Sequence, residues 1–227
     1  MPTPCYLVEE TGEQRVSLRR FGFGASEHEP TRHACPGRDQ TGSWKYGCDA
    51  SSPDLYTAPL ELYPDDHEKL AGLRKHPPEV PHDDPRWPAA CATCGQPFAH
   101  DEMWQTNGDP IMRVVSVVPG AALAVGEVAT VRDLPPGAIW EARWLRDFSA
   151  GFDGRAFICR LPDGHDWRID GEATNCTRKG DKSHRCWIRV GEPPYLSVSK
   201  QGETCSAGAG SILSPGYHGF LQHGVLT

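Results

Sequence analysis

The chain has 227 residues and a formal net charge of −7, with 38% hydrophobic side chains, 24 glycines and 21 prolines. An acidic chain without a lysine- or arginine-rich run lacks the basic face of duplex nucleic-acid binders, so we expect no direct duplex binding. The high glycine and proline content predicts short strands, many turns and long ordered loops.

No targeting or membrane-spanning pattern is present in the sequence. Residues 1–6 contain neither a basic n-region nor an apolar h-region, so no secretory signal peptide is expected. The longest apolar run, at residues 121–125, is too short to cross a bilayer. We therefore expect a protein of a cytoplasm with no membrane partner. Its nine cysteines are then interpreted as thiols and metal ligands rather than as a disulfide framework.

The N-terminal part, residues 1–110, is predicted to be loop-rich with one surface helix. Residues 6–8 and 16–24 read as two short strands, because apolar side chains alternate with others in the longer stretch. Residues 64–76 carry a helix pattern, with acidic side chains in the first turn, basic ones in the last turn and two prolines after it. Five prolines within residues 77–88 predict a stiff, extended strap.

Residues 111–227 are predicted to form a β-rich domain. Two valine-rich stretches, residues 114–118 and 125–131, are separated by Pro-Gly and fit a strand pair. Trp140, Trp144 and Phe148 recur every four residues, which favours one or two amphipathic helical turns. Burial is the ordinary purpose of such aromatic side chains. A docking face made by Trp140 and Trp144, or a platform for a sugar or base, is the sharper alternative.

The last third contains two hairpin patterns. Residues 157–161 and 165–170 flank a Pro-Asp-Gly turn, and residues 186–190 and 195–199 flank Gly-Glu-Pro-Pro. Residues 207–221 are rich in glycine and are predicted to be irregular. The expected fold is therefore mainly β with irregular loops and little helix, stapled by a zinc knuckle and rich in β-hairpins toward the C-terminus.

The strongest motif is Cys91-Ala-Thr-Cys94-Gly, a knuckle that directs two thiolates at one tetrahedral ion. Cys35 and Cys48 are its expected partners, although they are twelve residues apart in a loop and His33 competes with either. Four thiolates close the coordination sphere, so the cofactor implied is a structural zinc. A redox Cys-x-x-Cys and buried thiols without a metal are the alternatives.

A second cysteine/histidine group follows in the C-terminal third. Cys176 and Cys205 flank the second hairpin, and His184-x-Cys186 opens it, so these four side chains are candidates for a second metal or thiol cluster. Cys159, His165 and His218 are nearby in sequence. Structural thiols packed in a core are the alternative, because free cysteine is among the most buried residue types.

Nucleophilic catalysis is a weaker interpretation of the same region. Cys205 with His218 and either Asp170 or Asn175 supplies a thiol, a base and an orienting group. No catalytic signature surrounds Cys205, and no residue is assigned a catalytic role. A zinc- or thiol-dependent hydrolase built on the C-terminal cysteine/histidine group is nevertheless the competing hypothesis.

Five further motifs lie at residues 134–140, 161–167, 175–194, 204–212 and 217–221. In these motifs the chain resembles a group of uncharacterised tailed-bacteriophage and prophage proteins. The resemblance covers mainly residues 85–225 and implies a phage origin, but it carries no known chemistry.

The leading functional hypothesis is a non-enzymatic phage structural or accessory protein, such as a capsid- or tail-associated virion component. Proline straps, glycine-rich loops and an acidic surface suit a protein that lies over a partner. The expected partners are other phage or host proteins, and the chain could form an oligomer. An intracellular factor that binds a host protein is a further alternative.

Overall fold

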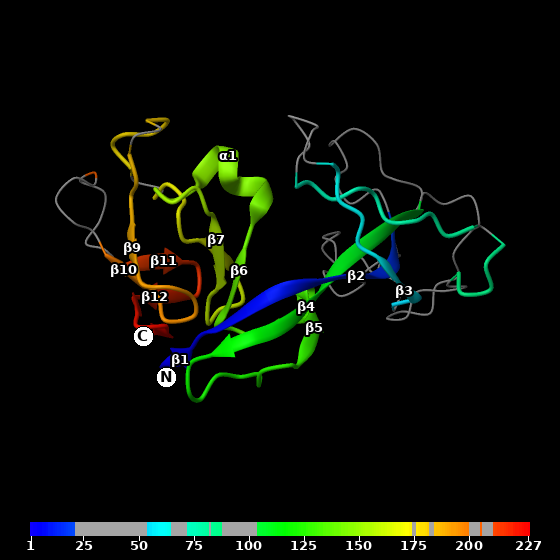
Figure 1. Cartoon of the computed structure of the whole chain (residues 1–227), viewed down its shortest axis with the longest axis horizontal. Coiled ribbons are helices and arrows are strands. Elements are labelled where there is room, and N and C mark those ends of the chain that lie inside the picture. The colour runs from blue at the N-terminus through cyan, green and yellow to red at the C-terminus, as the bar shows by residue number, and fades with distance from the viewer. Residues whose placement is uncertain are drawn as a thin grey trace, which may run out of the picture. The chain divides into compact units, whose positions relative to one another are not determined.

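The structure is a computed structural model that describes residues 1–20, 54–64, 72–81, 83–87, 104–173, 176–181, 184–199, 205 and 211–227. Within these ranges the chain is mainly β, as predicted (Figure 1). Helical structure there is limited to α1 (Arg146–Ser149) and the 3-10 turns η1 (Val131–Asp133) and η2 (Arg143–Leu145). The strands are β1 (Thr3–Pro4), β2 (Tyr6–Arg20), β3 (Tyr56–Pro59), β4 (Trp104–Val117), β5 (Val128–Thr130), β6 (Ala138–Glu141), β7 (Phe157–Arg160), β8 (Asp166–Arg168), β9 (Ile188–Val190), β10 (Ser197–Ser199), β11 (Ile212–Ser214), β12 (Tyr217–Gly219), β13 (Leu221–Gln222) and β14 (Val225–Leu226).

The chain divides into two compact units. The first comprises Met1–Thr11, Leu62–Leu73 and Ile111–Thr227, and the second comprises Gly12–Glu61 and Arg74–Pro110. The long strands β2 and β4 therefore contribute residues to both units. Residues 111–227 fall together, and the first eleven residues belong with them because β2 begins inside their sheet.

The main sheet has the strand order β5-β4-β2-β6-β7-β8, with β3 paired to β2 away from this path. In the first unit β2 runs parallel to β6, with Tyr6 opposite Ala138, whereas β6, β7 and β8 follow one another antiparallel. The predicted valine-rich strand pair is confirmed, since β4 and β5 pair antiparallel with Ile111 opposite Thr130.

Strands β6 and β7 bury both faces of the sheet, because successive side chains of a strand point to opposite sides. On one face Ile139, Phe157 and Cys159 pack with the C-terminal strands and with the cysteines discussed below. On the other face Trp140 and Ile158 pack with residues of β2, β4 and η2. The sheet therefore separates two apolar clusters of the first unit.

Three hairpins organise the C-terminal part, and two of them were predicted. The Pro-Asp-Gly hairpin is confirmed: β7 and β8 pair, and Gly164 takes a positive φ of 84° that suits glycine. The second hairpin is confirmed by the antiparallel pairing of β9 with β10. The expectation of an irregular stretch at residues 207–221 is wrong from Ile212 onward, where β11 and β12 form a further hairpin.

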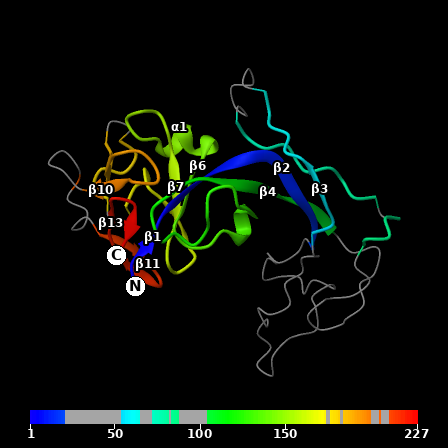
Figure 2. The same ribbon diagram turned by 60° about the horizontal axis from the view of Figure 1, so that its bottom comes forward.

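The two ends of the chain lie side by side, as both views show (Figures 1 and 2). Strand β14 pairs with β1 on one edge and with β13 on the other, with Thr3 opposite Leu226. Leu221 and Leu226 are fully buried against the core. This short sheet fixes both termini because each terminal strand supplies hydrogen bonds that the other needs.

The second unit is described only in part. Within it, residues 13–16 of β2 pair antiparallel with β3, and Gln14 donates its side-chain amide to the carbonyl of Pro59 at 2.7 Å. Val16, Leu18, Ala58 and Val80 form its buried cluster.

Three local expectations differ from the structure where the chain is described. Residues 73–76 are not helical, because Leu73 accepts a backbone hydrogen bond from Tyr63 and Lys75 donates one to Glu61; residues 65–71 lie outside the described ranges. Trp140 lies in strand β6 rather than in a helix that continues to Trp144. Residues 16–20 are strand as expected, but β2 begins at Tyr6, so one long strand replaces the two predicted ones.

Candidate metal centre

Cys176, His184, Cys186 and Cys205 come together in the first unit. Cys176 follows β8, His184 and Cys186 precede β9, and Cys205 follows β10, so the hairpin β9–β10 carries the segments that converge. The four ligand atoms all lie within 4.8 Å of one another, and all four residues are buried. The structure thus gathers the second group identified in the sequence.

The spacing of these atoms fits one tetrahedral ion. The Sγ atoms of Cys186 and Cys205 are 3.8 Å apart, and Sγ of Cys186 is 3.4 Å from Nε2 of His184. Two sulfurs bound at about 2.3 Å to one tetrahedral zinc lie about 3.8 Å apart, and a sulfur and an imidazole nitrogen about 3.5 Å apart. A disulfide needs about 2.05 Å between its sulfurs, so the geometry is that of a shared ligand shell rather than of a bond.

Backbone N–H groups point at two of the sulfurs. The N–H of Ala173 donates to Sγ of Cys186 at 3.2 Å, and that of Arg178 donates to Sγ of Cys176 at 3.3 Å. Hydrogen bonds to the charged form of a group stabilise that form, and partners in the outer shell of a metal site orient its ligands. The local backbone is therefore arranged to support thiolates.

The thiol form dominates when no cation is considered. Burial, and then hydrogen bonding with the thiols of Cys176 and Cys205, raises the pKa of Cys186 to about 12, although the Ala173 N–H opposes the shift. A bound divalent cation reverses this balance, since a coordinating thiol loses its proton outright. The cluster can thus act as a ligand set only together with an ion that supplies the compensating charge.

His184 presents its Nε2 atom to Cys186, while its Nδ1 atom is buried without a hydrogen-bond partner among the described residues. His184 is only 5% exposed. A neutral imidazole carries its proton on one nitrogen and uses the other as a ligand. A proton on Nδ1 therefore leaves Nε2 as the atom available to a metal.

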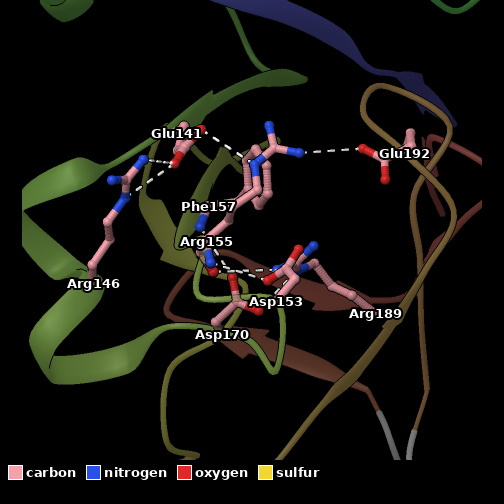
Figure 3. Close-up of polar contacts among 8 residues, drawn as sticks. All are labelled: Glu141, Arg146, Asp153, Arg155, Phe157, Asp170, Arg189 and Glu192. Atoms are coloured by element: carbon pink, nitrogen blue, oxygen red, sulfur yellow. Dashed lines mark hydrogen bonds and ion pairs between the residues drawn. The ribbon is translucent and has the colours of Figure 1, made fainter.

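A buried ion pair supports both sides of the cluster (Figure 3). Arg189 donates from Nε to Oδ1 of Asp170 and from Nη2 to Oδ1 of Asp153, each at 2.7 Å. The other carboxylate oxygen of Asp170 accepts from the backbone N–H of Phe157 at 3.0 Å. Burial raises the pKa of Asp170, and the contacts with Arg189 only partly offset that rise. The pair links β7, β9 and the turn after β8.

The same network reaches β6 through Phe157, whose ring lies beside two guanidinium groups. The guanidinium carbons of Arg155 and Arg189 are 4.6 and 4.7 Å from the ring centroid. Arg155 also contacts Glu141 and Glu192, each at 3.3 Å (Figure 3). Cation–π contacts and ion pairs of this kind fix the loop before β7 against the sheet.

The other candidates from the sequence are not part of the cluster. Cys35, Cys48, Cys91 and Cys94 lie outside the described residues, as does His33. Cys159 is fully buried on β7, where its thiol interacts with that of Cys5.

The members of the candidate catalytic set have other partners in the structure. Nε2 of His218 is 3.0 Å from Oγ of Ser211, and Asp170 is bound to Arg189; Asn175 lies outside the described residues. His165 is exposed in the β7–β8 turn, where its imidazole contacts Asp163. The four ligands instead come from the Cys/His group that brackets the second hairpin.

Trp140 does not form an exposed docking face. It is only 3% exposed because β6 is buried on both sides, whereas Trp144 in η2 is partly buried. Both indoles border the same pocket. The sequence analysis did not identify the ion pair between Asp170 and Arg189. The available signal was Arg189 itself, a basic residue inside a predicted strand and close in sequence to the candidate ligand Cys186.

Comparisons with protein-family models, curated proteins and solved structures gave no match to this chain. Among the described residues no helix has the length and apolar character needed to cross a membrane.

Proposed function

We propose that this chain is a zinc-stapled, β-rich structural or accessory protein of a tailed bacteriophage, without an activity of its own. The observation that carries the zinc part is the convergence of four buried ligand atoms within 4.8 Å. Three thiolates and one imidazole are a ligand set of structural zinc sites, and soft sulfur ligands favour zinc over magnesium or calcium.

The site is better suited to scaffolding than to hydrolysis. Catalytic zinc keeps one position open for water, whereas Cys176, His184, Cys186 and Cys205 fill a tetrahedral shell with protein atoms. Each of the four residues is at most 8% exposed, so a substrate has no direct approach to the ion. This closure favours the structural role over the zinc-hydrolase alternative.

A bound ion would join three segments that lack long regular structure. Cys176 follows β8, Cys186 begins the β9 hairpin and Cys205 follows β10, so one ion fixes the start and the end of the hairpin. Metal binding supplies folding free energy when the site does not exist in the unfolded chain. The stapled hairpin also brings Trp187 against Trp167, with the ring centroids 5.5 Å apart at 90°.

The phage setting rests on the resemblance of mainly residues 85–225 to uncharacterised tailed-phage proteins. A virion component needs a stable surface for other phage proteins, and the acidic chain with its proline-rich connections suits such a role. A factor that binds a host protein uses the same stapled scaffold and is distinguished by its absence from particles.

Metal analysis of purified variants tests the zinc assignment. Cys205→Ser and His184→Ala should each lose one equivalent of zinc relative to the unmodified protein. Cys159→Ser is the matched control, because this buried thiol lies outside the cluster and its loss should leave the metal content unchanged.

Full retention of zinc in both cluster variants would refute the centre. Cobalt substitution adds an independent check, since a tetrahedral cobalt–thiolate site gives intense visible absorption that an aqueous ion lacks.

Cosedimentation with intact phage particles tests the setting. A virion component should sediment with particles at a fixed ratio to the major capsid protein and resist a salt wash. Recovery of the whole protein in the soluble host fraction would contradict the virion role and favour the host-acting factor.

A further inference from the structure

The cysteines of the described residues all lie in one apolar cluster, and none of them forms a disulfide. They differ in what a small molecule can reach. Cys5 and Cys159 have no exposed surface, and Cys186 has only 1%. Cys176 and Cys205 each expose 8%. Hydrogen peroxide needs to touch only a sulfur and not the bound ion, so oxidation would begin at one of these two residues of the metal centre.

Cys205 has a second thiol beside it. Its Sγ atom is 3.8 Å from that of Cys186, and the pairing of Ile188 with Ser199 in the β9–β10 hairpin holds the two segments together. Cys186 precedes this pairing by two residues, and Cys205 follows it by six. A sulfenic acid condenses with a neighbouring thiol to a disulfide, and redox-sensor cysteines are often placed next to such a resolving cysteine. Cys205 and Cys186 have this arrangement, with the resolving thiol behind the more exposed one.

A bound ion keeps both sulfurs in their reactive form. The thiolate is the nucleophile of cysteine chemistry, and a thiol that coordinates a metal loses its proton outright. The backbone N–H of Ala173, 3.2 Å from Sγ of Cys186, supports the charge on that sulfur. The loaded centre therefore holds two thiolates at a spacing from which they can be oxidised together.

We propose that the centre is a reversible peroxide switch, in which Cys186 and Cys205 form a disulfide and the zinc is released. The inference rests on the proposed zinc centre. The thiolate of Cys205 attacks one oxygen of hydrogen peroxide, the O–O bond breaks, and the departing hydroxide takes up a proton to leave as water. The thiolate of Cys186 then attacks the sulfenic sulfur of Cys205 and displaces hydroxide, which is protonated to a second water. The two sulfurs supply the two electrons that reduce the peroxide, and zinc leaves as the divalent ion.

The disulfide replaces only part of what the ion connects. It joins the start and the end of the hairpin, but Cys176 and His184 lose their common partner. Because metal binding supplies folding free energy, the segment after β8 should lose stability while β9 and β10 stay linked. Disulfides are transient in a reducing cytoplasm, so thiol reductants would return the pair to the dithiol that binds zinc again.

Peptide mapping of the full-length protein tests the proposal. Trypsin cleaves after lysine and arginine, which places Cys176, Cys186 and Cys205 on the separate peptides 169–178, 186–189 and 201–227. After peroxide treatment without reductant, residues 186–189 should be joined to residues 201–227. One zinc should be released for each cross-linked chain, measured with a chromogenic chelator. A thiol reductant with added zinc should reverse both changes.

The metal content measured before oxidation separates the switch from the centre itself. Equal zinc in the unmodified protein and in Cys205→Ser would refute the centre, and the switch with it. Where the centre is loaded, three results would overturn the switch alone: zinc that stays bound, a link to residues 169–178, or sulfinic acid on Cys205 without a link.

Two variants identify the attacked and the resolving thiol. Cys186→Ser has no resolving thiol, so oxidation should stop at a sulfenic acid that dimedone captures on residues 201–227. Capture on residues 169–178 instead would assign the first attack to Cys176 and contradict the proposed order. Cys159→Ser is the matched control, because this fully buried thiol lies outside the centre and its loss should leave the yield of the cross-link unchanged.

Discussion

Arg189 donates a hydrogen bond from Nε to Oδ1 of Asp170 at 2.7 Å, and the two side chains are only 10% and 4% exposed. Arg189 follows the ligand Cys186 by three residues, and Asp170 precedes Ala173, whose N–H contacts that ligand's sulfur, by three residues. The ion pair and the hydrogen bond from Ala173 to Cys186 therefore both connect the chain after β8 with β9 and the residues just before it. The partners of the ion pair belong to β9 and to the turn after β8, next to two of the three segments that the ion would join.

Breaking this pair should be costly because it leaves a buried charge without compensation. Asp170→Asn or Arg189→Met is expected to lower the free energy of unfolding by about 3–5 kcal/mol, measured by urea denaturation. Arg178→Met is the control, since Arg178 pairs with Asp181 at the surface and an exposed pair contributes about 1 kcal/mol or less.

The double variant Asp170→Leu with Arg189→Met separates an ionic role from a packing role. Replacing both partners removes the uncompensated charge, so part of the lost stability should return. Additive losses from the two changes would contradict the ionic explanation.

Removal of the metal should loosen the C-terminal hairpin. Treatment with a strong chelator is expected to lower the melting temperature and to weaken the near-UV circular dichroism signal of the Trp167–Trp187 pair, because Trp187 follows the ligand Cys186. Added zinc should restore both signals, whereas magnesium should not. Cys205→Ser serves as the control, since its spectrum should already resemble that of the chelated protein.

The sequence was most informative where a local pattern determines the structure. The Pro-Asp-Gly turn predicted the β7–β8 hairpin, and the valines predicted β4 with β5, because turn chemistry and β-branched side chains act over a few residues. The predicted helix at Trp140 was wrong, since a four-residue aromatic spacing also arises when a buried strand is followed by a short helix. The short strands near the C-terminus were missed because β14 is stabilised by pairing with β1, more than two hundred residues earlier.

The candidate site shows the same limit. The types and order of Cys176, His184, Cys186 and Cys205 indicated a metal or thiol cluster, but spacing could not rank it above the Cys91–Cys94 knuckle. What distinguishes it is the closure of the hairpin, which is a tertiary property. The role of Arg189 depends on Asp170, nineteen residues away, and no sequence period encodes that contact.

The Cys91–Cys94 knuckle stays a separate prediction. Cys91→Ser or Cys94→Ser should release metal and cost several kcal/mol of stability, because an ordered loop would lose its anchor. With both centres loaded, the unmodified protein should contain two zinc ions per chain, and Cys91→Ser should retain one. Unchanged melting and unchanged metal content in Cys91→Ser would contradict the knuckle without affecting the C-terminal centre.

Asp163 should make the β7–β8 turn sensitive to acid. Its carboxylate accepts hydrogen bonds from the hydroxyl of Ser214 and from the backbone N–H groups of His165 and Gly216. Burial by itself raises the pKa of Asp163, but these bonds outweigh it and hold the pKa below its usual value. The charged form is therefore favoured in the folded state, so its contribution to stability is present above about pH 4 and is lost as the pH falls through the lower, folded-state pKa.

Asp163→Asn tests this sign directly. The variant should unfold about 1–2 kcal/mol more easily than the unmodified protein at pH 6, and the difference should shrink as the pH falls below about 4, where the Asp163 carboxyl binds a proton more readily in the unfolded chain than in the folded one. Urea denaturation at several pH values measures both quantities, with the exposed Asp147→Asn as the control. A difference that stays constant down to about pH 2 would show that Asp163 stabilises the turn by packing or shape, because a neutral contact has no proton to gain.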